Sequence, residues 1–187
     1  MPERKKVLAL CGSTRSKSTN LNFIEAVAAL GNQSFEINMY PSLAALPHFN
    51  PDLDTDTPPS EVAEFRRLIV ESDGVLICTP EYALGVPGSL KNALDWLVSS
   101  CELSHKPVAL ITAATSGAKA HESLLGTLQM IEAEVGEKSQ LLISFAKTKI
   151  NYSSEITDKI TLAAIEELIE AFTFSMHSKV LSHPTTE

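Results

Sequence analysis

Residues 7–20 read VLALCGSTRSKSTN. The first five letters are a short apolar run that ends at a glycine, which is typical of a strand buried on both faces of a sheet. The polar run from Gly12 to Asn20 leads directly into an apolar-periodic stretch over residues 21–30, which predicts a helix. A buried strand that passes through one polar loop into a helix indicates an α/β sheet.

The same alternation of buried strand and helix repeats along the chain. Further strands are predicted over residues 35–40, 75–79, 108–113 and 141–145, and further helices over residues 61–71, 89–100, 120–134 and 157–179. Because strands separated by helices run parallel with right-handed crossovers, we expect a five-stranded parallel sheet covered on both faces. Residues 41–60 form a long proline-rich loop, which we expect to overhang a site in this chain or in a neighbouring subunit.

The composition is that of an ordinary globular protein. Of the 187 residues 44% are hydrophobic and 20% charged, and 15 Lys and Arg against 23 Asp and Glu give a net charge of −8. This balance excludes intrinsic disorder and argues against nucleic acid or anionic membrane as partners. No apolar run reaches the ~20 residues of a membrane span, and the three cysteines lack the spacing of a metal site or disulfide framework. We expect one domain over residues 1–187, cytoplasmic and without a metal.

The loop after the first strand has the composition of a phosphate-binding loop. Between Gly12 and Asn20 it carries several hydroxyls, the cations Arg15 and Lys17, and no carboxylate. The free N–H groups and the dipole of the following helix attract an anion to the same place. The loop matches neither the nucleoside-triphosphate motif nor G-x-G-x-x-G. A Ser or Thr helix cap explains one hydroxyl but neither their density nor Arg15, so we predict that the loop binds a phosphate monoester.

Two further polar loops follow predicted strands, at residues 79–88 and 114–117. In a flavodoxin-like three-layer sandwich with strand order 2-1-3-4-5, the carboxyl ends of the strands meet at one edge, where ligands bind. We predict this fold. The three loops then form one crevice, in which the first loop binds phosphate and the other two hold a flat, hydrogen-bonding ring.

Two blocks of letters resemble the NADPH-dependent FMN reductase family, which includes flavodoxin-like quinone, azo-dye and chromate reductases. The first block is Gly12-Ser13-Thr14-Arg15-x-x-Ser18-x-Asn20. The second, which is the more specific, is TPEY at residues 79–82 followed by PGSLKNALDW at residues 87–96. Together with the strand order, the resemblance extends over residues 7–145.

The resemblance implies an FMN-dependent oxidoreductase in which hydride passes from NADPH or NADH through FMN to a quinone-like or other small acceptor. No catalytic side chain is needed, because the cofactor carries the chemistry. By the resemblance, Ser13, Arg15, Ser18 and Asn20 would hold the FMN phosphate with Thr19 beside them, Pro80, Glu81, Tyr82 and Ala83 would line the ring, and Thr115, Ser116 and Gly117 would close its far side.

The family usually forms homodimers or homotetramers, which the resemblance implies here as well. Asn92 and Trp96 lie one turn apart on the predicted helix, opposite its core-facing stripe. An exposed Trp indicates a partner surface or a plain packing role, and we expect the subunit contact on the face between Lys91 and Trp96.

Two alternatives stay open. A flavin-binding electron carrier or sensor would use the same fold without a nicotinamide site, and Ala120 and His121 keep this alternative open because relatives often have two glycines there. A low-molecular-weight phosphatase would need Cys11 as nucleophile and an Arg at Lys17, whereas Arg15 follows Cys11 after only three residues.

Four residues near the predicted ring site also need an interpretation. Ala83 and Leu84 depart from the family pattern, in which Asn follows the Tyr and a hydroxyl lies near the next Gly. We interpret Glu81 as a structural residue or a subunit contact. We interpret His121 as a surface residue at the start of a helix.

Overall fold

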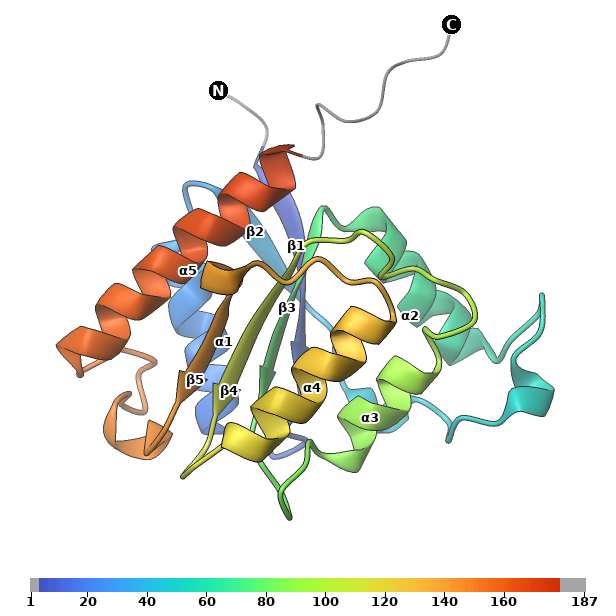
Figure 1. Cartoon of the computed structure of the whole chain (residues 1–187), viewed down its shortest axis with the longest axis horizontal. Helices are drawn as coiled ribbons and strands as arrows, with labels where there is room; N and C mark the ends of the chain where they lie inside the picture. Colours follow the sequence, from blue (N-terminus) through green and yellow to red (C-terminus); the bar gives the residue numbers. More distant parts are fainter. Residues whose placement is uncertain (1–3, 179–187) are drawn as a thin grey trace, which may run out of the picture.

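The computed structural model describes residues 4–178, and its centre is one parallel sheet (Figure 1). The strand order is β2-β1-β3-β4-β5, and every neighbouring pair is parallel. This confirms the predicted flavodoxin-like order. The strands are β1 (Lys5–Cys11), β2 (Phe35–Met39), β3 (Gly74–Thr79), β4 (Val108–Ala113) and β5 (Gln140–Ile143).

The sheet forms because its central strands are apolar along their whole length. Every residue of β3 and β4 is buried, which requires a protein layer on both faces. The first strand is two residues longer than predicted, since Lys5 and Lys6 pair with Phe35 and Glu36 of β2. The last strand is shorter, because the chain turns at Phe145 with a φ of 53°.

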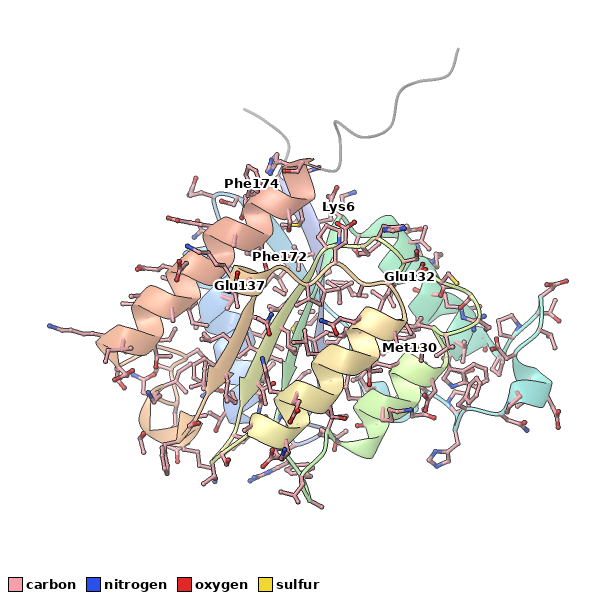
Figure 2. All side chains as sticks on the ribbon, viewed as in Figure 1. Lys6, Met130, Glu132, Glu137, Phe172 and Phe174 are labelled. Atoms are coloured by element: carbon pink, nitrogen blue, oxygen red, sulfur yellow. The ribbon has the colours of Figure 1, made fainter. Side chains whose placement is uncertain are left out.

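Helices cover the two faces unequally (Figure 1). One core lies under α1 and α5 and the other under α2, α3 and α4. In the first, Phe172 on the inner side of α5 packs edge to face against Phe35 with ring centroids 6.0 Å apart (Figure 2). The helices are α1 (Thr19–Leu30), α2 (Ser60–Glu71), α3 (Gly88–Asp95), α4 (Ala118–Met130) and α5 (Lys159–Ser178). The predicted end of the last helix at Lys179 lies outside the described residues.

The prediction of an exposed Trp96 is wrong. The α-helix ends at Asp95 rather than Ser100, and Trp96 is fully buried. Its Nε1–H donates to the carbonyl oxygen of Pro47 at 2.9 Å, and its ring packs edge-on against Phe49 at 5.0 Å. Trp96, on which we centred the expected subunit contact, therefore packs within the chain, whereas Lys91 on the same face is exposed.

Asn92, one turn before Trp96, also packs within the chain, where it holds part of the proline-rich loop. Its Nδ2 donates to Pro47 O at 2.9 Å, and its Oδ1 accepts from the N–H of Phe49 at 2.7 Å. Residues 47–49 are thereby fixed onto the end of α3. The loop also contains two 3-10 turns, η1 (Leu43–Ala45) and η2 (Pro51–Leu53), each begun by a capping side chain, Ser42 and Asn50.

Residues 4–178 show neither a membrane-spanning helix nor a cluster of metal ligands. No helix there is long and apolar enough to cross a bilayer. The same residues contain no group of three His, Cys, Asp or Glu side chains that could hold a metal ion.

Candidate functional site

The three predicted loops lie at the same edge of the sheet, where β1, β3 and β4 end. Gly12 brings the first loop against β3, with its N–H donating to Cys78 O at 2.8 Å. A Cβ at Gly12 would lie 2.4 Å from Thr79 Oγ1, so only glycine permits this approach. The first loop and the loop after β3 are therefore in direct contact.

The first loop is rich in hydrogen-bond donors that have no acceptor in the described chain. They include the backbone N–H groups of Thr14, Ser16, Lys17 and Ser18. Ser18 caps α1 by accepting from the N–H of Asn20 at 3.2 Å. Arg15 lies beside these groups, and neither it nor Lys17 has an ion pair within residues 4–178. Free N–H groups, a helix dipole and two unpaired cations suit an anion.

Asn20 has a structural function that the sequence did not reveal. It is 4% exposed, and its Nδ2 donates to Ala113 O at 3.3 Å. Its Oδ1 accepts from the Cys78 thiol at 3.3 Å. One side chain therefore ties the start of α1 to the ends of β3 and β4, and its two polar atoms are already engaged. Thr19 begins α1 next to it.

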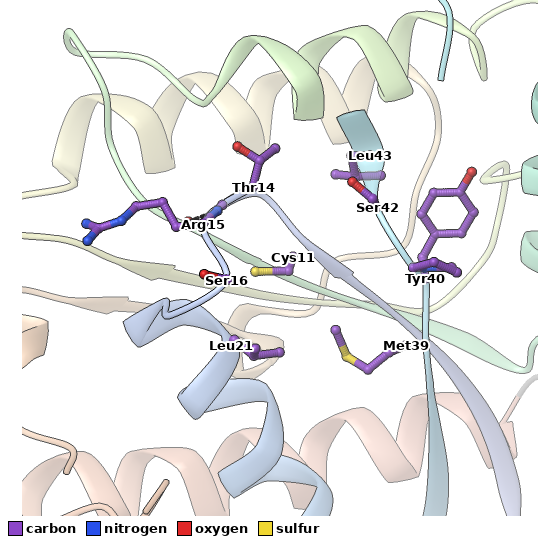
Figure 3. Close-up of a pocket in the computed structure, with 11 residues that line it drawn as sticks. Cys11, Thr14, Arg15, Ser16, Leu21, Met39, Tyr40, Ser42 and Leu43 are labelled. Atoms are coloured by element: carbon purple, nitrogen blue, oxygen red, sulfur yellow. Dashed lines mark hydrogen bonds between the residues drawn. The ribbon is translucent and has the colours of Figure 1, made fainter. Parts of the chain in front are cut away.

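A cavity of about 200 Å³ adjoins the first loop (Figure 3). Of the predicted site residues, Ser13 and Arg15 line it. Its other wall is formed by Met39 and Tyr40, which the sequence did not predict, and by residues 41–43 of the proline-rich loop, which we expected to overhang a site. The signal was present, because β2 ends at the same sheet edge as β1. The lining residues are Cys11, Ser13, Thr14, Arg15, Ser16, Leu21, Met39, Tyr40, Pro41, Ser42 and Leu43.

The loop after β3 contains a tight turn in an uncommon conformation. The N–H of Tyr82 donates to Gly85 O at 2.8 Å and the N–H of Gly85 donates back to Tyr82 O at 3.0 Å. The central residues Ala83 and Leu84 have φ values of 49° and 64°, the left-handed region that Asn and Gly favour in such turns. Strained backbone of this kind gathers at ligand sites. The turn presents Tyr82, 50% exposed, and Leu84, 72% exposed, at the sheet edge.

Glu81 connects the second loop to the third. Its Oε2 accepts from the N–H of Ala120 at 3.0 Å, in the first turn of α4. A carboxylate at this position also complements the positive end of the helix dipole. Glu81 is therefore structural, which confirms one of the two interpretations that the sequence offered.

The third loop ends at Gly117, which caps α4 with a φ of 91°. The loop itself is held by the two residues that follow β5, because Ser144 Oγ–H donates to Ser116 O at 3.0 Å and the N–H of Phe145 donates to Thr115 O at 3.1 Å. All predicted ring-side residues thus lie at one edge. None of them lines the cavity beside the first loop.

Replacing Gly117 with alanine is expected to lower the free energy of unfolding by about 1 to 2 kcal/mol. A Cβ there would lie 2.8 Å from Leu142 Cδ1, on a backbone with positive φ. Urea denaturation of the variant gives the difference. Gly126→Ala on the same helix is the control, because a Cβ at Gly126 meets nothing within 4 Å. Equal stability of the two variants would contradict the assigned conformation.

His121 is half-buried rather than a surface residue, which corrects the sequence interpretation. Its Nδ1 lies 2.9 Å from Thr112 Oγ1 and its Nε2 lies 3.3 Å from Gln140 Oε1. Burial lowers the pKa of His121 below its usual 6.5, although the bond to Gln140 opposes the shift. The neutral imidazole therefore links β4, α4 and β5.

Comparison with known proteins gives the site a family. The family model described as NADPH-dependent FMN reductase matches residues 5–148, which contain all three loops. The chain belongs to this family. It is therefore an oxidoreductase that uses FMN and NADPH or NADH.

Individual relatives agree with this family membership. The quinone reductase of Escherichia coli strain K12 is 32% identical over 179 residues, which cover 92% of this chain and 95% of that protein. A Burkholderia 2-hydroxy-1,4-benzoquinone reductase is 30% identical and covers 89% and 93%. Among solved structures, the flavoenzyme NAD(P)H:(acceptor) oxidoreductase FerB from Paracoccus denitrificans has a TM-score of 0.74 at 25% identity, covering 93% of this chain and 98% of that chain.

The first loop fits the phosphate of FMN. It offers free backbone N–H groups and two cations that have no ion pair within residues 4–178, and it carries no carboxylate. The same loop argues against phosphatase chemistry in the reductase. Burial raises the pKa of the Cys11 thiol, although the Ser13 N–H and the Ser18 hydroxyl oppose the shift. A nucleophilic cysteine needs the opposite shift, because the thiolate is the reactive form.

The reductase should lose stability as the pH falls from about 7.5 to about 5.5, in part through His121. With a lowered folded pKa, the folded state binds fewer protons than the unfolded state below 6.5, so acid favours unfolding. Denaturant titrations at several pH values give the slope. The slope should be smaller in His121→Gln, which has no titrating group there. An unchanged slope in the variant would contradict the assignment.

Proposed function

We propose that this chain is an FMN-dependent NAD(P)H oxidoreductase that passes hydride from the nicotinamide through bound FMN to a quinone-like or other small acceptor. When bound, FMN supplies the hydride-accepting and hydride-donating centre. The observation that carries the proposal is the loop of unpaired donors at the start of α1, in a chain whose family uses FMN. The names of the relatives support a quinone as acceptor.

The proposed residue roles follow the geometry of the loops. Ser13, Arg15 and Ser18 hold the phosphate, with Thr19 at the first turn of α1, while Asn20 keeps the loop in place through its bonds to Cys78 and Ala113 O. On the ring side, the proposed lining residues are Pro80, Glu81, Tyr82, Ala83, Thr115, Ser116 and Gly117. Glu81 sets the distance between the two ring-side loops through Ala120.

We further propose that residues 1–187 act as a single flavin-binding domain in the cytoplasm, as a homodimer or homotetramer. Free thiols at Cys11, Cys78 and Cys101 suit a reducing compartment. Because Trp96 is occupied within the chain, the exposed apolar side chains Tyr82, Leu84 and Phe145 at the sheet edge are better candidates for the subunit contact.

The experiment is an anaerobic titration of the FMN-loaded protein with NADPH and then NADH, followed by the oxidised-flavin absorbance near ~450 nm. Rapid bleaching, reversed by a benzoquinone, is the expected result. Bound flavin that neither cofactor bleaches would identify an electron carrier or sensor instead. Failure to bind FMN would overturn the proposal as a whole.

Arg15→Ala is expected to weaken FMN binding about tenfold to a hundredfold, because a charge-assisted hydrogen bond to phosphate is lost. Calorimetric titration with FMN measures the dissociation constant. Arg4→Ala removes an exposed Arg at the opposite end of β1, where Arg4 pairs with Glu36, and should leave the constant unchanged. If both variants bind FMN as the wild type does, Arg15 does not contact the phosphate.

A further inference from the structure

The cavity beside the phosphate loop is on the wrong side of that loop to hold the flavin ring. Its walls are the ends of β1 and β2, with Leu21 of α1. The loops proposed for the ring follow β3 and β4, which lie on the other side of β1 in the sheet order. A ligand whose phosphate lies in the first loop therefore has two directions in which to extend, and FMN uses only one of them.

The side chains that line the cavity suit a second flat ring, joined to the flavin through phosphate groups. Leu21 and Met39 point toward one another from α1 and β2 below Cys11, and they offer an apolar surface for a flat ring (Figure 3). None of the lining residues is acidic, although the whole chain has a net charge of −8. An anionic ligand therefore meets no repelling side chain along this wall.

Hydroxyl groups at the rim supply the polar contacts. Ser42 Oγ accepts from the N–H of Ala44 at 3.3 Å, which leaves its own proton without an acceptor in the described chain. The hydroxyl protons of Thr14 and Ser16 on the opposite rim likewise have no acceptor in the described chain. A ribose and the ring nitrogens of a base can accept from such donors.

The volume of the cavity and the charge of the loop restrict the class of ligand further. The cavity of about 200 Å³ is smaller than the roughly 300 to 1,000 Å³ that encloses a whole drug-sized ligand, so it suits one part of a larger molecule. Arg15 lines the cavity and Lys17 follows in the same loop, and neither has an ion pair within residues 4–178, so the loop carries two cations for the two groups of a pyrophosphate. A pyrophosphate in the loop would place a nucleoside on its far side.

We propose that the cavity between the ends of β1 and β2 binds the adenylate half of FAD, so that the phosphate loop accepts FAD as well as FMN. The flavin then extends over β3 and β4 and the adenosine over β2. The inference rests on the proposed function, because both use the same phosphate loop.

The test is calorimetric titration of the flavin-free protein with FMN and with FAD. Wild-type protein should bind FAD at least as tightly as FMN. Met39→Trp fills the cavity from β2 and should weaken FAD binding at least about tenfold while FMN binding stays within about twofold. Met39→Glu, which places a carboxylate on the apolar surface proposed for the second ring, should act in the same direction and serves if the Trp variant fails to fold.

The matched control is Met130→Trp, the same exchange on an α4 side chain that is 67% exposed and outside the site (Figure 2). It should change neither affinity. Wild-type protein that binds FMN but binds FAD more than about tenfold more weakly would overturn this inference alone. A Met39 variant that weakens FMN and FAD equally, or neither, would also overturn it. Protein that binds neither flavin would overturn the proposed function together with the inference.

Discussion

Trp96→Ala is expected to lower the free energy of unfolding by about 3 to 5 kcal/mol. The side chain is fully buried, packs edge-on against Phe49 and donates a hydrogen bond to Pro47 O. Alanine leaves a cavity and also releases the segment that runs from the end of β2 to η2. Because this segment begins with the cavity wall at Tyr40 and Leu43, the affinity for FAD should fall as well, while FMN, which does not reach this cavity, should bind as before. Denaturant titration and flavin calorimetry measure the two effects.

Two controls separate packing from hydrogen bonding at Trp96. Trp96→Phe keeps an aromatic ring but no N–H, and should cost about 1 kcal/mol, since Pro47 O still accepts from Asn92. Phe174→Ala removes an aromatic side chain that is 74% exposed on α5, and should change stability by less than about 0.5 kcal/mol. If Trp96→Ala costs no more than Phe174→Ala, then Trp96 does not anchor the segment.

The sheet could be predicted because its signals are local. Apolar runs such as residues 75–79 and 108–113 are too short for helices and end in turn residues, so each marks a doubly buried strand wherever it lies in the chain. The strand order needed more than local signals, and it came from assigning the alternation of strands and helices, with polar loops at the strand ends, to the flavodoxin-like sandwich. The three loops at one edge then followed from parallel topology alone.

The error at Trp96 shows where local reasoning fails. The apolar spacing of residues 90–101 continues past Asp95, so periodicity extends the helix and places Trp96 on its outer side. The partners that bury it, Pro47 and Phe49, are nearly fifty residues away in the sequence. No pattern in either segment indicates the other. Tertiary contact, rather than helix propensity, decides both the helix end and the burial.

The candidate site, like the fold, could be predicted from the sequence only in part. Ser13 and Arg15 lie where the composition of the loop placed them, because a strand–loop–helix unit fixes its own geometry. The structural tasks of Asn20, Glu81 and His121 were harder to find, because each side chain bonds to groups from another strand or helix. The contribution of Met39 and Tyr40 to the cavity wall was not predicted, because apolar letters at a strand end do not by themselves indicate a cavity and only the parallel topology placed them beside the first loop.

Arg66→Ala is expected to cost about 3 kcal/mol of stability. Arg66 on α2 is 12% exposed at its side chain, and its Nη2 lies 2.7 Å from Asp54 Oδ1 while its Nε lies 3.6 Å from Glu102 Oε1. The Nε–H also donates to Trp96 O at 3.1 Å, at the end of α3. Removing the guanidinium leaves two carboxylates, each 9% exposed at the side chain, without their cation. Denaturant titration measures the loss.

The neighbouring arginine provides a matched control. Arg67 pairs with Glu64 and Glu71, but all three side chains are more than half exposed, so Arg67→Ala should change stability little. A triple variant, Arg66→Met with Asp54→Asn and Glu102→Gln, should recover part of the loss. The reason is that the unpaired buried charges, and not the missing bonds alone, cause most of the cost. A triple variant less stable than Arg66→Ala would show instead that the bonds of Asp54 to Ser99 and of Glu102 to Ser100 hold the loop without the arginine.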